Sequence, residues 1–76
     1  MSRFELDVPE LVVHLDSKRA QAGQTWRDLG HELGIAPSIF SRMKSGRRPD
    51  ADALVTLIAW LDIDLSCVTK PKERTS

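Results

Sequence analysis

Cysteine is nearly missing from this chain, and so are the features that mark membrane or exported proteins. Cys67 is the one cysteine among 76 residues, which excludes an internal disulfide and a metal site built from several cysteines. The longest apolar stretch without a charged residue runs from 53 to 61, far short of the roughly 20 residues that span a bilayer as a helix. No basic-then-apolar leader opens the chain. We therefore expect a cytoplasmic protein that does not enter a membrane.

Sequence signs of catalysis and of cofactor binding are absent as well. There is no glycine-rich phosphate loop, and no spacing brings a nucleophile, a base and an acid together. His14 and His31 are isolated, so a structural or surface role is expected for both rather than metal binding. A chain of this length forms one domain. We expect no enzymatic activity, no metal, no cofactor and no small-molecule ligand.

Net positive charge is absent from the chain as a whole but not from its middle. Lys and Arg together number 11, and so do Asp and Glu. The charge balance is −3 over residues 1–16, +5 over residues 17–49 and −2 over residues 50–76. A local basic patch, rather than the total charge, attracts phosphate groups. The middle of the chain is therefore where a nucleic-acid site is expected.

Two short helices are predicted within this basic region. Thr25 and Asp28 have the spacing of an N-terminal capping box, so the first helix is expected to begin there. Gly34 can adopt the left-handed conformation that ends a helix. Pro37 suits the first position of a second helix, which is expected to run to Ser45. The two helices would follow each other across a tight turn.

The second helix is expected to present two different faces. Phe40 and Met43 lie three residues apart and form a narrow apolar face that should be buried. Ser38 and Arg42 are then left facing outward, on a helix that can enter the major groove of B-DNA, about 12 Å wide. Gly30, in the middle of the preceding helix, costs about 1 kcal/mol relative to Ala. That residue is explained if the two helices touch there.

The remaining segments are predicted to add two more helices and two extended or irregular ends. Helices are expected over 9–22 and 50–61, and 64–69 is expected to form a short helix capped by Asp64 or a strand. Residues 1–8 alternate apolar and charged side chains, which indicates an arm, an edge strand or part of a dimer contact. The apolar positions expected in the core are Leu11, Val12, Leu15, Ala22, Leu54, Leu57, Ile58, Leu61 and Ile63.

The pattern of the middle region resembles the phage-repressor and Cro-like helix-turn-helix family, also called the xenobiotic-response-element family. The matching positions are Thr25, Leu29, Gly30, Gly34, Ile35, Phe40, Ser41, Met43, Gly46 and Pro49, followed by Leu54, Leu57, Leu61 and Ile63. The resemblance covers roughly residues 11–68. Three positions depart from the family pattern: Gly30 stands where Ala is usual, Trp26 where Gln is common, and Pro37 where a polar residue often contacts a base.

This resemblance implies a fold, a domain division and a function. The fold would be all-α, a compact lambda-repressor-like bundle of four to five helices with a possible extended segment at either end. Residues 1–8 would be an arm, 9–69 the DNA-binding domain and 70–76 a disordered tail. The function would be that of a dimeric transcription regulator that binds double-stranded operator DNA in a bacterial cell or a phage-infected host.

The resemblance also assigns contacts with DNA. Base edges would be contacted by Pro37, Ser38 and Arg42, and we add Ile39, because an exposed isoleucine there could touch a thymine methyl or be a surface residue without a role. Arg42 is the expected specificity residue, since its guanidinium fits guanine O6 and N7. Phosphate contact is expected of Thr25, Trp26, Arg27, Ala36, Ser41, Lys44, Ser45, Arg47 and Arg48.

Several residues have alternative interpretations at this point. Trp26 could donate its indole N–H to a phosphate, or it could cover the core. Arg19 is expected to direct its charge toward solvent or phosphate, whereas Glu5 and Asp7 should repel phosphates. Exposure of Trp60 and the apolar alternation of residues 1–8 favour a second hypothesis, a protein-interaction module such as an antitoxin or adaptor.

Overall fold

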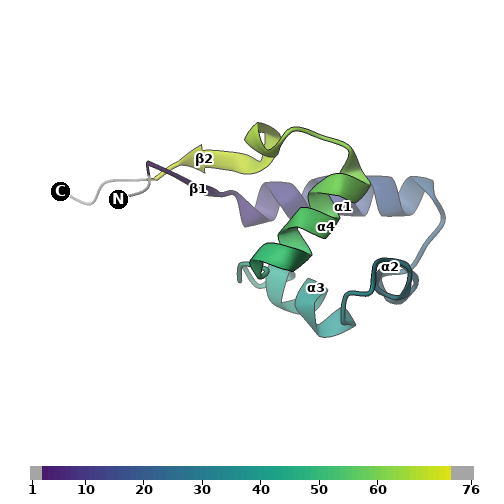
Figure 1. Cartoon of the computed structure of the whole chain (residues 1–76). Helices are drawn as coiled ribbons and strands as arrows, with labels where there is room; N and C mark the ends of the chain where they lie inside the picture. The colour runs from purple at the N-terminus through teal and green to yellow at the C-terminus, as the bar shows by residue number, and fades with distance from the viewer. Residues whose placement is uncertain (1–2, 73–76) are drawn as a thin grey trace.

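The computed structural model of this chain describes residues 3–72, which form a mostly helical globule with a small two-stranded sheet (Figure 1). The elements in chain order are β1 (Phe4–Leu6), α1 (Val8–Gln21), α2 (Trp26–Leu33), α3 (Pro37–Lys44), α4 (Ala51–Leu61), the 3₁₀ helix η1 (Leu65–Val68) and β2 (Thr69–Pro71). The four predicted helices are confirmed to within a residue or two at their ends. The sheet makes the fold mostly helical rather than all-α.

Helix α1 begins and ends where local chemistry allows. The side chain of Asp7 accepts a hydrogen bond of 3.2 Å from the backbone N–H of Glu10, which satisfies one of the unpaired donors of the first turn. Val8 already belongs to the helix and is buried, so the last residue of the expected arm is part of the core. The prediction that Ala22 is buried was wrong, because this residue lies at the C-cap, beyond the last helical turn, and is exposed.

The turn between α2 and α3 forms as predicted. Thr25 and Asp28 make both bonds of a capping box, at 3.0 and 3.1 Å. Gly34 takes the left-handed conformation, with φ of 70°, and ends α2, while Pro37 occupies the first turn of α3. A Cβ placed on Gly30 would lie 2.5 Å from the backbone oxygen of Ile35. The close approach inferred from this glycine is therefore confirmed.

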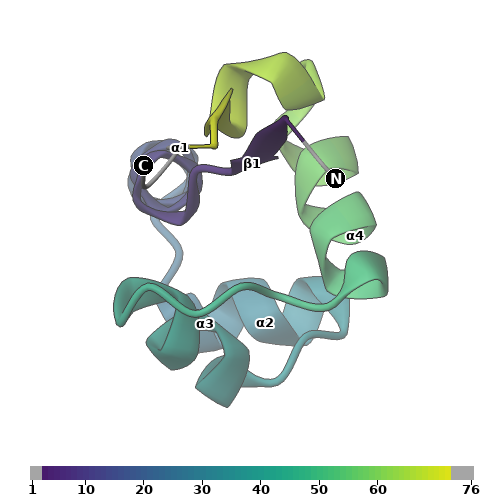
Figure 2. The same ribbon diagram turned by 90° about the vertical axis from the view of Figure 1, so that its left-hand side faces the viewer.

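The core lies between α1 and α4 on one side and α2 and α3 on the other (Figures 1 and 2). Helix α4 starts at Asp50, whose side chain accepts a 2.7 Å bond from the N–H of Ala53, and ends at Asp62 in the left-handed conformation. Leu54 and Ile58, expected in the core, are half-buried and pack against it. The buried residues are Val8, Leu11, Leu15, Leu29, Ile35, Phe40, Met43, Ala53, Leu57, Leu61 and Val68.

The two strands join the ends of the described chain. β1 and β2 are antiparallel, with Glu5 opposite Lys70, and the pairing extends to a 2.8 Å bond from Lys72 N–H to the oxygen of Arg3. Hydrogen-bonded and non-hydrogen-bonded pairs alternate along such a ladder. Pro71 therefore falls at a position where its missing N–H is not needed.

This pairing changes the expected ends of the domain. Of the alternatives for residues 1–8, the structure has a strand over Phe4–Leu6, while residues 1 and 2 lie outside the described residues. The segment 64–69 is a 3₁₀ helix that leads into a strand. Asp64 makes no capping bond through its side chain. The prediction of a disordered tail from residue 70 was wrong for 70 and 71, which lie in β2. The rest of that tail, 73–76, lies outside the described residues. Within 3–72, none of the helices has the length and apolar character needed to cross a membrane.

Candidate nucleic-acid interface

The outer face of α3 carries the polar residues that the sequence singled out. Phe40 and Met43 are each only 2% exposed and anchor the helix to the core. At about 100° per residue, Ser38 and Arg42 lie on the opposite side of the helix, and both are exposed. Also exposed, on α3 and at its two ends, are Ala36, Pro37, Ser41, Lys44 and Ser45, all expected to contact DNA. Helix α3 therefore presents the polar side chains of Ser38, Ser41 and Arg42 to solvent.

Two arginines on and after α3 have free side chains. Neither Arg42 nor Arg47 makes a side-chain hydrogen bond or an ion pair with any other residue in the range 3–72. The backbone around them is nevertheless held in place, because the N–H of Arg47 donates to the oxygen of Arg42 at 2.9 Å and Gly46 takes a positive φ of 94°. The result is two available guanidinium groups, one on α3 and one on the turn that follows it.

Ile39 departs from its predicted exposure. It is half-buried and packs against the core, because its position on α3 turns it toward the loop that leads into α4. Together with Arg42, Arg48, Pro49 and Asp50 it lines a surface hollow of about 290 Å³. Its expected reach toward a thymine methyl is correspondingly reduced.

Trp26 packs against the core, and its ring contacts two cationic side chains. It is half-buried, and its ring lies 5.2 Å from that of Phe40 at 43°. The ammonium of Lys44 lies 4.4 Å from the indole centroid and the guanidinium of Arg19 lies 5.0 Å from it, both within cation–π range. Of the two interpretations left open by the sequence, the contacts present are those of a core cover. The amino group of Lys44 is thereby drawn toward the indole, although the residue is exposed.

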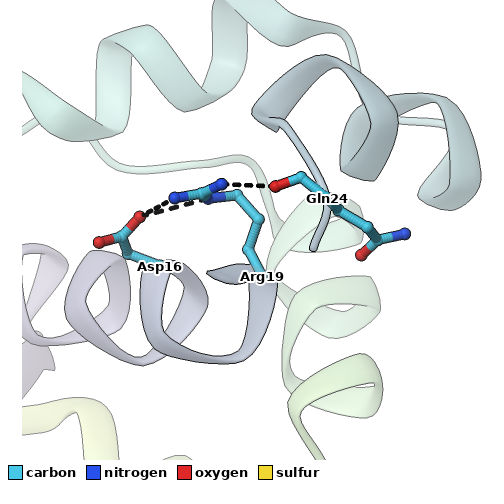
Figure 3. A network of polar contacts seen from close by, with 3 residues as sticks. All are labelled: Asp16, Arg19 and Gln24. Carbon is cyan, nitrogen blue, oxygen red and sulfur yellow. Dashed lines mark hydrogen bonds and ion pairs between the residues drawn. The ribbon is translucent and has the colours of Figure 1, made fainter. Parts of the chain in front are cut away.

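Arg19 lies in a polar network that the sequence did not indicate (Figure 3). Its guanidinium donates to the carboxylate of Asp16, at 3.2 Å through Nε and 2.6 Å through Nη2, and to the backbone oxygen of Gln24. The side chain is only 20% exposed. The expectation that its charge turns to solvent or to phosphate was therefore wrong. Arg19 instead ties the end of α1 to the loop before α2.

The N-terminus of α2 already has an anion from the chain itself close to it, the carboxylate of Asp28. Backbone and side-chain hydrogen bonds with Thr25 hold the pKa of the exposed Asp28 carboxyl below its usual 3.8. The charged carboxylate offsets part of the positive potential of the helix N-terminus. Arg27, one residue earlier, is exposed and has no side-chain partner within the described chain. At this end of α2, Arg27 is therefore a cation whose side chain is free within residues 3–72.

Arg48 differs from its neighbour Arg47 because it has an internal partner. Its Nη2 lies 3.2 Å from Oε2 of Glu5, and the other oxygen of Glu5 lies 3.9 Å from the amino group of Lys70. The expected repulsion between Glu5 and phosphates is thus replaced by an ion pair with one of the expected phosphate ligands. Sequence reasoning missed this contact because it depends on the pairing of β1 with β2, for which no local signal exists.

Metal chemistry has no support among the residues that the structure places. No group of three or more His, Cys, Asp or Glu side chains there could hold a metal ion. The imidazole of His14 lies 3.4 Å from a carboxylate oxygen of Glu10 on the same helix, and Cys67 is an exposed free thiol. The candidate interface is therefore a surface of serines and arginines.

Comparison of the chain with protein-family models, with curated proteins and with solved structures finds no match. The functional interpretation therefore depends on the surface geometry described above.

Proposed function

We propose that this chain is a helix-turn-helix protein of the lambda-repressor-like type that binds specific double-stranded DNA sites and regulates transcription. The observation that carries the proposal is the free guanidinium of Arg42 on the solvent face of a helix whose opposite face is held by Phe40 and Met43. A helix of eight residues is about 12 Å long at 1.5 Å per residue. Its size suits insertion into the major groove.

The residues divide into two roles. Arg42 makes a bidentate contact with a guanine, and Ser38 adds a weaker contact with a neighbouring base. Arg47, Ser41 and Ser45 bind phosphates, which positions α3 without reading sequence. Arg27, Ala36 and Pro37 line a groove of about 460 Å³ between α2 and α3, and Arg27 would bind a further phosphate there.

We further propose that the protein binds as a homodimer. One α3 covers only a few base pairs, and two copies related by a twofold axis would place their helices in successive major grooves about 34 Å apart. The operator would then be a palindrome with half-sites one helical turn apart. Sedimentation of the free protein and of its DNA complex measures the stoichiometry.

Selection of binding sites from a random DNA pool tests the function and the role of Arg42 together. We expect wild type to enrich a palindromic site and Arg42→Ala to lose about 1–3 kcal/mol at one base-pair position in each half-site. Arg47→Gln is the matched control, since it should weaken binding to all sequences alike and reduce the salt dependence by about one phosphate contact. An even loss over all sequences for Arg42→Ala would remove its assignment as a base-reading residue. Failure to enrich any sequence would contradict the proposal itself.

A protein-interaction role is the second candidate, because four large apolar side chains within residues 3–72 are exposed. They are Phe4 at 63%, Val13 at 60%, Val55 at 68% and Leu65 at 46%. The expected exposure of Trp60 was wrong, since this residue is half-buried and packs against the core. Apolar association is little affected by salt, whereas DNA binding weakens steeply as salt is raised. Measurement of the dominant interaction at two salt concentrations separates the two candidates.

A further inference from the structure

Glu5 and Arg48 connect the sheet to the surface proposed to bind DNA. The side chain of Glu5 is 20% exposed, and its carboxylate lies 3.2 Å from the guanidinium of Arg48, whose side chain is 62% exposed. Glu5 also faces Lys70 at 3.9 Å. Arg48 lines the same hollow as Arg42, so an internal anion sits at the edge of the proposed interface.

The position of this anion is set by backbone pairing rather than by chance contact of flexible side chains. Glu5 lies on β1 directly opposite Lys70 on β2. The strand pair is held at its inner end by a 2.6 Å bond from the N–H of Asp7 to the oxygen of the buried Val68. Arg48 follows the turn that ends α3 and precedes Pro49, whose ring restricts the backbone at that point. Both partners are therefore presented by ordered backbone.

The pair is weak enough to be exchanged for a phosphate. An exposed ion pair shifts an equilibrium by no more than about fivefold, and a DNA phosphate offers Arg48 an equivalent anion. When Arg48 leaves, Glu5 keeps Lys70 as a partner, so the exchange does not leave a carboxylate without a counter-ion. Arg47 has no such internal partner within residues 3–72, which makes the two adjacent arginines unequal.

We propose that Glu5 acts as an internal competitor for DNA phosphate at Arg48 and thereby lowers the general affinity of the protein for DNA. The inference rests on the DNA binding proposed above and names a regulatory contact within that same surface. Because it acts on a phosphate ligand, it lowers affinity for all sequences alike. Discrimination then depends more on Arg42 than on the arginines of the loop.

Binding of an unrelated duplex of about 30 base pairs, followed by fluorescence anisotropy over a series of salt concentrations, tests the proposal. We expect Glu5→Gln to bind roughly three- to fivefold more tightly near 50 mM salt, because Arg48 no longer gives up an ion pair when it binds DNA. The salt slope should stay close to that of wild type, because Arg48 contacts one phosphate in both complexes. Glu5→Thr, which also removes the carboxylate and favours strand structure, should give the same tightening. Circular dichroism and thermal unfolding of each variant verify that the strand pair and the helices remain folded.

Two further variants separate the contact from a general change of charge. Glu10→Gln removes one negative charge from the side chain that faces His14 and should tighten binding by less than Glu5→Gln. In an Arg48→Gln background, Glu5→Gln should tighten binding no more than Glu10→Gln does. Equal tightening by Glu10→Gln and Glu5→Gln, or a Glu5→Gln effect that persists in full without Arg48, would overturn the assignment.

The outcomes also distinguish this inference from the proposed function. If wild type binds duplex DNA and Glu5→Gln binds with equal or weaker affinity, the role of Glu5 is overturned but the proposed function is not. If neither wild type nor Glu5→Gln binds any duplex at 50 mM salt, the proposed function is overturned, and the inference about Glu5 with it.

Discussion

The basic residues at the end of α1 and those of α3 with its following loop differ in what they contact. Lys18 donates to the backbone oxygen of Trp60 and lies 4.8 Å from its ring, and Arg19 is held by Asp16, Gln24 and Trp26. Arg42 and Arg47 have exposed side chains with no such partners in the described chain. The first pair stabilises the fold, and the second pair is available to a ligand.

This difference shows why charge counted along the chain overstates a binding surface. Residues 17–49 carry a balance of +5, yet Lys18 and Arg19 are engaged within the protein and Arg48 is paired with Glu5. The surface that remains is smaller and centred on Arg42 and Arg47. Substitution of the cations engaged within the protein should therefore lower stability, whereas substitution of the free cations should weaken DNA binding.

The largest effect is expected from Gly30→Ala, which disturbs the support beneath α3. The added Cβ would lie 2.5 Å from the backbone oxygen of Ile35 and 3.3 Å from the ring of Phe40, so the turn must move. We expect a loss of about 3 kcal/mol in the free energy of unfolding, measured by urea denaturation. Gly23→Ala is the control, since a Cβ meets nothing there and only the φ of 69° is unfavourable; its cost should be about 1 kcal/mol. Equal costs would contradict the close helix approach.

A smaller loss of stability is expected from Arg19→Met, which tests a cation engaged within the protein. Methionine keeps an apolar stem near Trp26 but removes the donors to Asp16 and to the backbone oxygen of Gln24 (Figure 3). We expect a loss of about 1–2 kcal/mol in the free energy of unfolding, with DNA affinity unchanged where the protein is folded.

Arg27→Met is the matched variant among the cations that have no partner within the described chain. Arg27 is exposed and has no side-chain partner in residues 3–72, so its loss should change stability by less than about 0.5 kcal/mol while weakening DNA binding. The comparison would fail if the two variants showed the same stability and the same affinity.

The smallest effect is expected from Asp28→Asn and depends on pH. Hydrogen bonds with Thr25 lower the pKa of Asp28 in the folded state below 3.8, whereas the unfolded value is about 3.9. The charged carboxylate therefore stabilises the fold above that unfolded value, and its contribution is lost as pH falls through the folded pKa. The gap in Tm between wild type and Asp28→Asn should shrink from pH 7 to pH 2.5. A gap in Tm that stays constant from pH 7 to pH 2.5 would contradict the assignment.

Most helix boundaries could be predicted because their causes lie within a few residues. Thr25, Gly34, Pro37 and Asp50 each act on the backbone of their own turn. Ala22 was misplaced because helical spacing continues past the residue where the chain leaves the helix. Ile39 was misplaced because its burial depends on the loop that passes beside it. The network of Arg19 could not be foreseen, since it requires the distance between two helices.

The sequence by itself determined where the helices begin and end and that Phe40 and Met43 face inward, because caps and apolar periodicity act over single turns. Only the tertiary structure decided which cations remain free. Glu5 reaches Arg48 across 43 positions, and that contact exists because β1 and β2 pair in one register. Charge interactions act through space rather than along the chain, so their partners are decided by the packing of distant elements.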